Sequence, residues 1–116
     1  MGRSQGAGVK YGLIALLAGG TLLAQIPWEK DQRPAGQALY RENCVVCHEV
    51  DRAESKKMGP SFYQLFKREK MPLSNMKPNR PYIAVRVKFG GKLMPAFQKK
   101  LTDAQINSLI DYLESR

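Results

Sequence analysis

The sequence predicts a small all-α domain that follows an N-terminal hydrophobic segment. Length gives the first observation, since 116 residues leave room for one such domain once a targeting segment is subtracted. The second observation is a central C-x-x-C-H motif with no parallel-sheet pattern around it. The third is a C-terminal stretch whose apolar residues recur at helical spacing, at Ile106, Leu109, Ile110 and Leu113.

The first part of the chain has the pattern of an export signal. Residues 1–10 carry two basic residues and no acid, and residues 11–28 carry no charge. Tyr11 and Trp28 bracket the apolar run as interfacial anchors do, and no A-x-A cleavage site follows it, which slightly favours a retained anchor. We assign the chain to a signal peptide or uncleaved membrane anchor, a polar linker and a folded domain, over residues 1–28, 29–34 and 35–116.

One helix is expected on each side of the central motif. Residues 35–43 lead into it as a helix, in which Gly36 lowers the helix propensity and so indicates the close approach of another helix. After the motif, Ser61 and Gln64 have the spacing of a capping box, and the apolar residues behind them share one face. This pattern predicts a short helix over residues 61–70.

The next stretch is less regular. Residues 71–78 form a connection interrupted by prolines. Pro81 could begin a helix that Gly90 ends, yet the apolar residues between them alternate with a period of two, as in a strand. Periodicity alone leaves residues 81–89 undecided.

The C-terminal helix has the clearest signals. Thr102 and Gln105 form a second capping-box pattern, and Asp103 places an acid in the first turn. With the apolar stripe that follows, they predict an amphipathic helix over residues 103–115.

The central motif predicts a haem site. Cys44, Cys47 and His48 form the C-x-x-C-H signature of covalent haem attachment. On one helical turn both thiols face the same way, so each can bond to one vinyl group of the same porphyrin while His48 lies beneath the iron. We therefore predict one haem c, bound covalently through Cys44 and Cys47.

Three other sites use similar residues. A thioredoxin-like redox pair expects a βαβ context, which the sequence does not show. A zinc site needs about four ligands, so two cysteines and one histidine would have to recruit a carboxylate. A disulfide between Cys44 and Cys47 would close too short a loop to stabilise the fold much.

The second axial ligand decides between an electron carrier and an enzyme. The chain has one histidine, so a methionine is the natural partner of His48. Met58 is too close to His48 in sequence, whereas Met71 and Met94 are each followed by a proline that stiffens the loop. We favour Met94, which lies in a loop between two expected elements, and assign Met71 to packing. With both axial positions filled, the expected function is one-electron transfer.

The charge of the chain is strongly basic. The formal net charge is +9, and residues 52–100 hold thirteen Lys or Arg against Glu54 and Glu69. A basic surface attracts acidic partners. We expect these partners to be redox proteins, such as a reductase, a dehydrogenase or a terminal oxidase. Nucleic acid is excluded as a partner, because the basic residues form no recognised binding motif. A c-type haem also implies a periplasmic or other extracytoplasmic location.

These motifs resemble those of the small bacterial class I cytochromes c over about residues 35–113. Gly36, Tyr40 and Cys44 repeat the spacing of that family's first helix. Residues 109–113 are similar to its C-terminal helix, which crosses the first helix at the glycine. The order of Gly59-Pro60 and the later Met-Pro-Ala-Phe loop is also that of the family.

The resemblance implies a fold of about four short helices wrapped around the haem, with residues 81–89 as one of them. It also implies that the Pro60 carbonyl accepts a hydrogen bond from Nδ1 of His48, and that Met94 is the second axial ligand. The basic, proline-rich connection departs from the family pattern. The candidates for binding the haem carboxylates are accordingly a set of three, Arg80, Tyr82 and Arg86.

The function that follows is electron transfer between acidic partners. A cleaved signal would make a free carrier, and a tether through residues 11–28 would make a haem subunit of a larger membrane redox complex in a respiratory chain. Two other classes compete. One is a haem enzyme or gas sensor with a displaceable methionine, and the other is a haem-free basic binding module.

Overall fold

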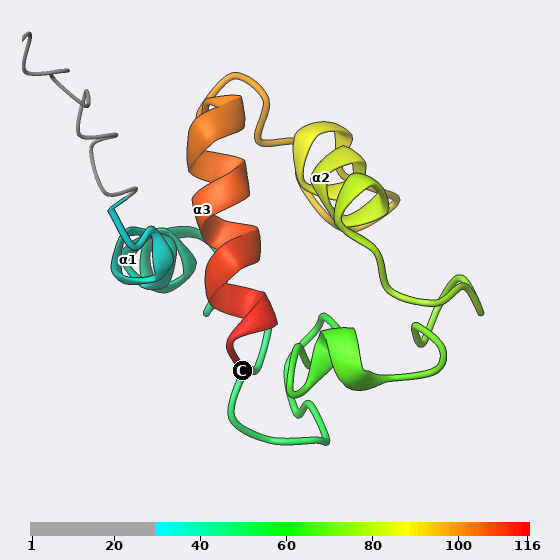
Figure 1. The fold of residues 1–116 in the computed structure, drawn as a ribbon. Helices are drawn as coiled ribbons and strands as arrows, with labels where there is room; N and C mark the ends of the chain where they lie inside the picture. Colours follow the sequence, from blue (N-terminus) through cyan, green and yellow to red (C-terminus); the bar gives the residue numbers. More distant parts are fainter. Residues whose placement is uncertain (1–29) are drawn as a thin grey trace, which may run out of the picture.

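The computed structural model describes residues 30–116 (Figure 1). Its elements are α1 (Arg33–Asn43), the 3-10 helix η1 (Leu65–Lys67), α2 (Arg80–Phe89) and α3 (Asp103–Glu114). These residues contain no strand, so the predicted all-α fold is confirmed. In the same part of the chain, no helix is long and apolar enough to cross a membrane. The predicted signal or anchor, residues 1–28, lies outside the described residues.

Helix α3 lies between α1 and α2 and packs against both (Figure 1). The capping box predicted at its N-terminus is present, since Thr102 Oγ1 accepts from Gln105 N–H at 3.2 Å and Gln105 Oε1 accepts from Thr102 N–H at 2.8 Å. Each fully buried aliphatic side chain contributes about 1.5–3 kcal/mol to folding. The largest fully buried side chains are those of the predicted stripe, Ile106, Leu109, Ile110 and Leu113.

Helix α1 crosses α3 at Gly36. A Cβ atom on Gly36 would lie 1.9 Å from the carbonyl oxygen of Ser108, so a residue with a side chain does not fit there without moving a helix. One turn further along α1, Tyr40 packs against Tyr112 with ring centroids 5.7 Å apart. The prediction that Gly36 marks the close approach of another helix is confirmed.

The start of α1 differs from the prediction. The helix begins at Arg33 rather than residue 35, and Pro34 occupies its first turn. Proline suits this place, because its fixed φ is helical and its missing N–H would have no partner there. Helix α1 therefore takes in the last two residues of the expected linker.

Residues 80–89 form the helix α2, as the resemblance implied and as periodicity alone could not decide. The Asn79 side chain caps the helix at its N-terminus, and Gly90, with φ of 70°, ends it. Only one apolar side chain of α2, Val87, is buried, whereas Phe89 is 60% exposed. The apolar residues of α2 therefore do not share one buried face, which explains why their spacing did not reveal a helix.

The predicted helix over residues 61–70 is wrong, because this region contains only η1. Ser61 Oγ donates a hydrogen bond to the carbonyl of Arg52 instead of capping a helix, and it accepts from the N–H two residues later at 3.0 Å. Gln64 has φ of 48°, in the left-handed region that a right-handed helix excludes. A contact with a distant part of the chain has therefore overridden the local pattern.

We expect Gly36→Ala to lower the free energy of unfolding by about 1–3 kcal/mol, because the new Cβ would force α1 away from Ser108. Guanidinium unfolding followed by circular dichroism measures this change. Alanine also raises helix propensity by about 1 kcal/mol, so an unchanged or increased stability would contradict the close crossing. Ala38→Ser, at an exposed position of α1, is the control and should change the stability by less than about 0.5 kcal/mol.

Candidate functional site

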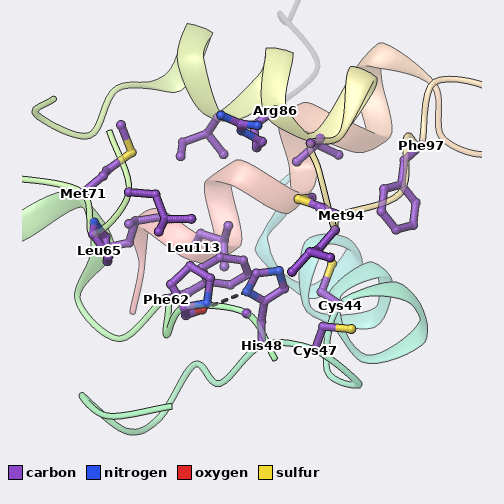
Figure 2. A pocket seen from close by; sticks show the side chains of 18 of the residues that line it. Cys44, Cys47, His48, Phe62, Leu65, Met71, Arg86, Met94, Phe97 and Leu113 are labelled. Carbon is purple, nitrogen blue, oxygen red and sulfur yellow. Dashed lines mark hydrogen bonds between the residues drawn. The ribbon is translucent and has the colours of Figure 1, made fainter. Parts of the chain in front are cut away.

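A cavity of about 490 Å³ opens between the turn after α1, helices α2 and α3, and the loop that joins these two helices (Figure 2). This volume is typical of cofactor pockets, which span about 300–1,000 Å³. Most of its lining side chains are apolar, and Leu109 and Leu113 bring the stripe of α3 to its wall. The site residues predicted from the sequence all line this cavity, namely Cys44, Cys47, His48, Pro60 and Met94.

The two cysteines lie on one turn that continues from the end of α1. The N–H groups of Cys47 and His48 donate to the carbonyl oxygen of Cys44 at 3.1 and 2.9 Å. Both thiols are free, and burial raises the pKa of the Cys44 thiol to about 11. The turn therefore presents two free thiols to the same cavity.

His48 is buried and held on two sides. Its Nδ1 lies 2.8 Å from the carbonyl oxygen of Pro60, so Nδ1–H donates and Nε2 keeps its lone pair. Phe62 stacks on the imidazole with ring centroids 4.1 Å apart and an interplanar angle of 19°. Burial lowers the pKa of His48, which favours the neutral imidazole that binds metals.

Gly59 allows the loop after the motif to approach His48. A Cβ atom at this position would lie 2.5 Å from Cε1 and 2.6 Å from Nδ1 of the imidazole. The N–H of Gly59 also donates to the carbonyl of Cys47 at 2.7 Å. Gly59 thus holds the turn through the Cys47 carbonyl, and Pro60 holds the imidazole ring of His48.

Three methionines line the cavity, and they differ in burial. Met71 is 6% exposed and Met58 is 73% exposed, whereas Met94 is half-buried. Figure 2 draws Met94 on the same side as Cys44, and Met71 beside Leu65 at the other end of the view. Another methionine downstream of His48, Met76, is not among the lining residues. The lining of the cavity therefore leaves three methionines as possible axial ligands and does not select one of them.

The polar candidates of α2 have different surroundings. Tyr82 and Arg86 line the cavity, and Arg86 Nη2 donates to the Tyr82 hydroxyl at 2.8 Å, a bond that lowers the pKa of Tyr82. Arg80 does not line it, and its guanidinium donates to Asp111 at 2.8 Å and to Glu114 at 2.6 Å. We therefore remove Arg80 from the candidates for the haem carboxylates.

Sequence reasoning missed two residues at the cavity wall. Phe62 lies in the stretch 61–70 for which a helix was predicted, yet it stacks on the ring of His48. Asn43 lines the cavity, and its Oδ1 is buried without a hydrogen-bond partner. Its position directly before Cys44 is the signal that could have identified it, because the helix that carries the motif ends there.

The residues present fit a covalently bound haem. The turn offers two thiols, His48 offers a nitrogen ligand with a fixed tautomer, and the methionines of the lining offer thioether sulfur. The apolar side chains of the lining suit a porphyrin. Among the lining residues, Asn43 Oδ1 is a buried acceptor without a hydrogen-bond partner. Residues 30–116 contain no cluster of three or more His, Cys, Asp or Glu side chains that could hold a metal ion in the way a zinc site does.

Comparison with known proteins gives one family and one curated relative. The family model described as cytochrome C oxidase, cbb3-type, subunit III matches residues 31–113. The chain is also similar to cytochrome c-551 of Pseudomonas aeruginosa, with 42% identity over 53 residues. This alignment covers 45% of the chain and 44% of the relative, so the chain spans less than half the length of the curated relative that it matches.

We expect Gly59→Ala to displace His48, since the new Cβ would lie within 2.6 Å of two ring atoms and 2.8 Å from the carbonyl oxygen of Cys47. The expected result is a loss of about 1–3 kcal/mol of stability together with a changed visible spectrum of the haem-loaded protein. Gly91→Ala is the comparison variant, because the three atoms nearest to its Cβ all belong to the Arg86 side chain and none to the backbone. Equal effects of the two substitutions would show that Gly59 has no specific role beside His48.

Proposed function

Because the chain belongs to the family of cytochrome c oxidase, cbb3-type, subunit III, we propose that it carries single electrons with His48 and Met94 as the axial ligands of its haem. The family makes the chain a small class I c-type cytochrome and a haem electron-transfer protein. It implies one haem c bound covalently through a cysteine pair, and Cys44 and Cys47 have the required spacing. The three helices of the described residues agree with the cytochrome c fold.

The observation that carries the proposal is the fixed tautomer of His48. Nδ1–H is engaged by Pro60, which directs the ligand role to Nε2 and orients the ring. The bound haem supplies an iron that alternates between Fe(II) and Fe(III), and ligation by histidine and methionine raises its potential. The apolar wall excludes water from this centre, so the residues around it reorganise little when the charge changes.

Contacts of the surrounding loop support Met94 as the second ligand. The carbonyl of Met94 accepts from Gly91 N–H at 2.9 Å, and Phe97 N–H donates to Val87 at 3.0 Å. These bonds hold the loop against the end of α2, with Met94 inside the cavity. Met71 is almost fully buried, which suits the packing role predicted for it.

The mouth of the cavity supports the proposed docking of acidic partners. Three apolar side chains that line it are largely exposed, with exposed fractions of 73% at Met58, 86% at Leu73 and 75% at Leu93. Lys92 stands beside them as an exposed cation. Exposed apolar side chains next to a basic residue suit the docking of a redox protein whose contact surface is acidic.

A terminal oxidase is the partner class that the family description favours. The matched family is that of an oxidase subunit, so a place in a larger oxidase complex is the second candidate besides a free carrier. Both candidates place the chain on the periplasmic side. A tether through residues 11–28 would favour the complex.

We expect Met94→Ala to open the iron to carbon monoxide, because its sulfur is the proposed axial ligand. Visible spectra of the ferrous protein from a haem-maturing host, recorded with and without carbon monoxide, measure this. Wild type and the control Met71→Ala should keep a spectrum that ignores the gas. If Met71→Ala alone responds, the ligand assignment is wrong, and a response of the wild type favours a haem enzyme or sensor.

We expect electron transfer to an acidic redox partner to slow as salt rises. Raising ionic strength from about 0.01 M to about 1 M shortens the Debye length from about 30 Å to about 3 Å, so the bimolecular rate should fall at least about tenfold. Stopped-flow kinetics measures this rate. Lys92→Gln, at the cavity mouth, should slow the reaction at low salt, whereas Arg41→Gln on the exposed side of α1 is the control. A rate indifferent to salt would contradict basic docking.

A further inference from the structure

The ammonium group of Lys57 lies against the backbone of the haem-attachment turn. Its Nζ donates to the carbonyl of Val45 and to the carbonyl of His48, the latter at 3.2 Å. Glu49 Oε1 lies 3.8 Å from the same nitrogen. Both side chains are partly buried, with exposed fractions of 28% for Lys57 and 21% for Glu49.

The ammonium group makes two hydrogen bonds and one ion pair here. Two of its three N–H donors are accepted by carbonyl oxygens of the turn. The Glu49 carboxylate adds the ion pair at 3.8 Å, which is longer than a hydrogen bond. The turn continues from the end of α1, where a cation near the last carbonyls is electrostatically favourable. Tyr40 donates to the same His48 carbonyl at 2.8 Å, so this oxygen is held from two directions.

Lys57 also belongs to the segment that supports the ring of His48. Its own N–H donates to Ser55 Oγ at 3.1 Å, and the chain then continues directly to Gly59 and Pro60, which contact the turn and the imidazole. The Lys57 side chain therefore contacts the carbonyl groups of Val45 and His48. The backbone of Gly59 and Pro60 contacts the Cys47 carbonyl and the His48 imidazole. Neither of the nearby charges Lys56 and Glu54 has an ion pair or a side-chain hydrogen bond in the described residues.

We propose that Lys57 is a positioning residue whose ammonium group clamps the attachment turn and, together with Glu49, sets the reduction potential of the haem. The inference rests on the proposed role of His48 as an axial ligand. On reduction the haem site gains one electron, so its net charge falls by one. A fixed positive charge beside the turn stabilises the reduced state, and a fixed negative charge destabilises it. Because the pair is partly buried, salt screens it less than the exposed lysines.

The two members of the pair should shift the potential in opposite directions. Lys57→Met removes the cation and leaves the Glu49 carboxylate without its partner, so the reduced form should lose stability. Glu49→Gln removes the anion and leaves the cation, so the reduced form should gain stability. A purely structural clamp would weaken the fold in both variants and give no such opposition of sign.

The test is a spectroelectrochemical titration of the full chain, matured with haem, at low salt. At a fixed ambient potential we expect Lys57→Met to lower the ferrous-to-ferric ratio about three- to tenfold and Glu49→Gln to raise it. Lys56→Met and Glu54→Gln are controls with the same charge changes in the same loop, and they should shift the ratio less than about twofold. Guanidinium unfolding of each variant measures separately how much the substitution changes the stability of the fold.

Shifts of the same sign in Lys57→Met and Glu49→Gln, or shifts no larger than those of the controls, would overturn the inference. If Lys57→Met fails to acquire haem, the comparison of Lys57→Gln with Lys57→Arg replaces it. The arginine variant keeps the charge and should hold the higher potential, and equal potentials would reject the proposal. A wild type without covalent haem, or one that binds carbon monoxide, would instead contradict the proposed function.

Discussion

The close crossing of α1 and α3 at Gly36 is the constraint on which the rest of the structure depends. Without a Cβ at this point the two backbones come into contact, and α1 leads directly into the turn that carries Cys44 and His48. The turns of α3 that make the crossing, through Ser108 and Tyr112, also supply the neighbouring Leu109 and Leu113 to the wall of the cavity. One helix packing therefore fixes both the hydrophobic core and the place of the haem-attachment turn relative to it.

The cavity lies within the core rather than beside it. A domain of this size buries a limited apolar surface, and small domains usually need a metal, disulfide or cofactor to be stable. Here two of the fully buried side chains of α3, Leu109 and Leu113, line the cavity, and Ile83 and Val87 of α2 line it as well. A haem in this position would complete the interior, so attachment of the cofactor and stability of the fold are coupled.

Sequence reasoning succeeded where the determinants are local. The capping box at Thr102 and the C-x-x-C-H motif depend on residues a few positions apart, and both lie as expected. It failed at Ser61, whose capping pattern was correct locally but whose hydroxyl bonds to a carbonyl nine residues earlier. The helix α2 was found only through resemblance, because its apolar residues are divided between a buried and an exposed side. The role of Lys57 had no local signal, since its partners lie eight to twelve residues away.

The two sides of the cavity differ in how firmly they are held. The His48 side combines a hydrogen bond from its ring, a stacked aromatic ring and two donors to its carbonyl, from Tyr40 and Lys57. The Met94 side depends on a loop with two backbone hydrogen bonds to α2, at Val87 and Lys88, and one between Gly91 and Met94. A thioether is also a weaker ligand than an oriented imidazole. If Met94 is the second axial ligand, as proposed, substitutions on its side would open the iron to external ligands, whereas substitutions on the His48 side would disturb haem attachment and fold together.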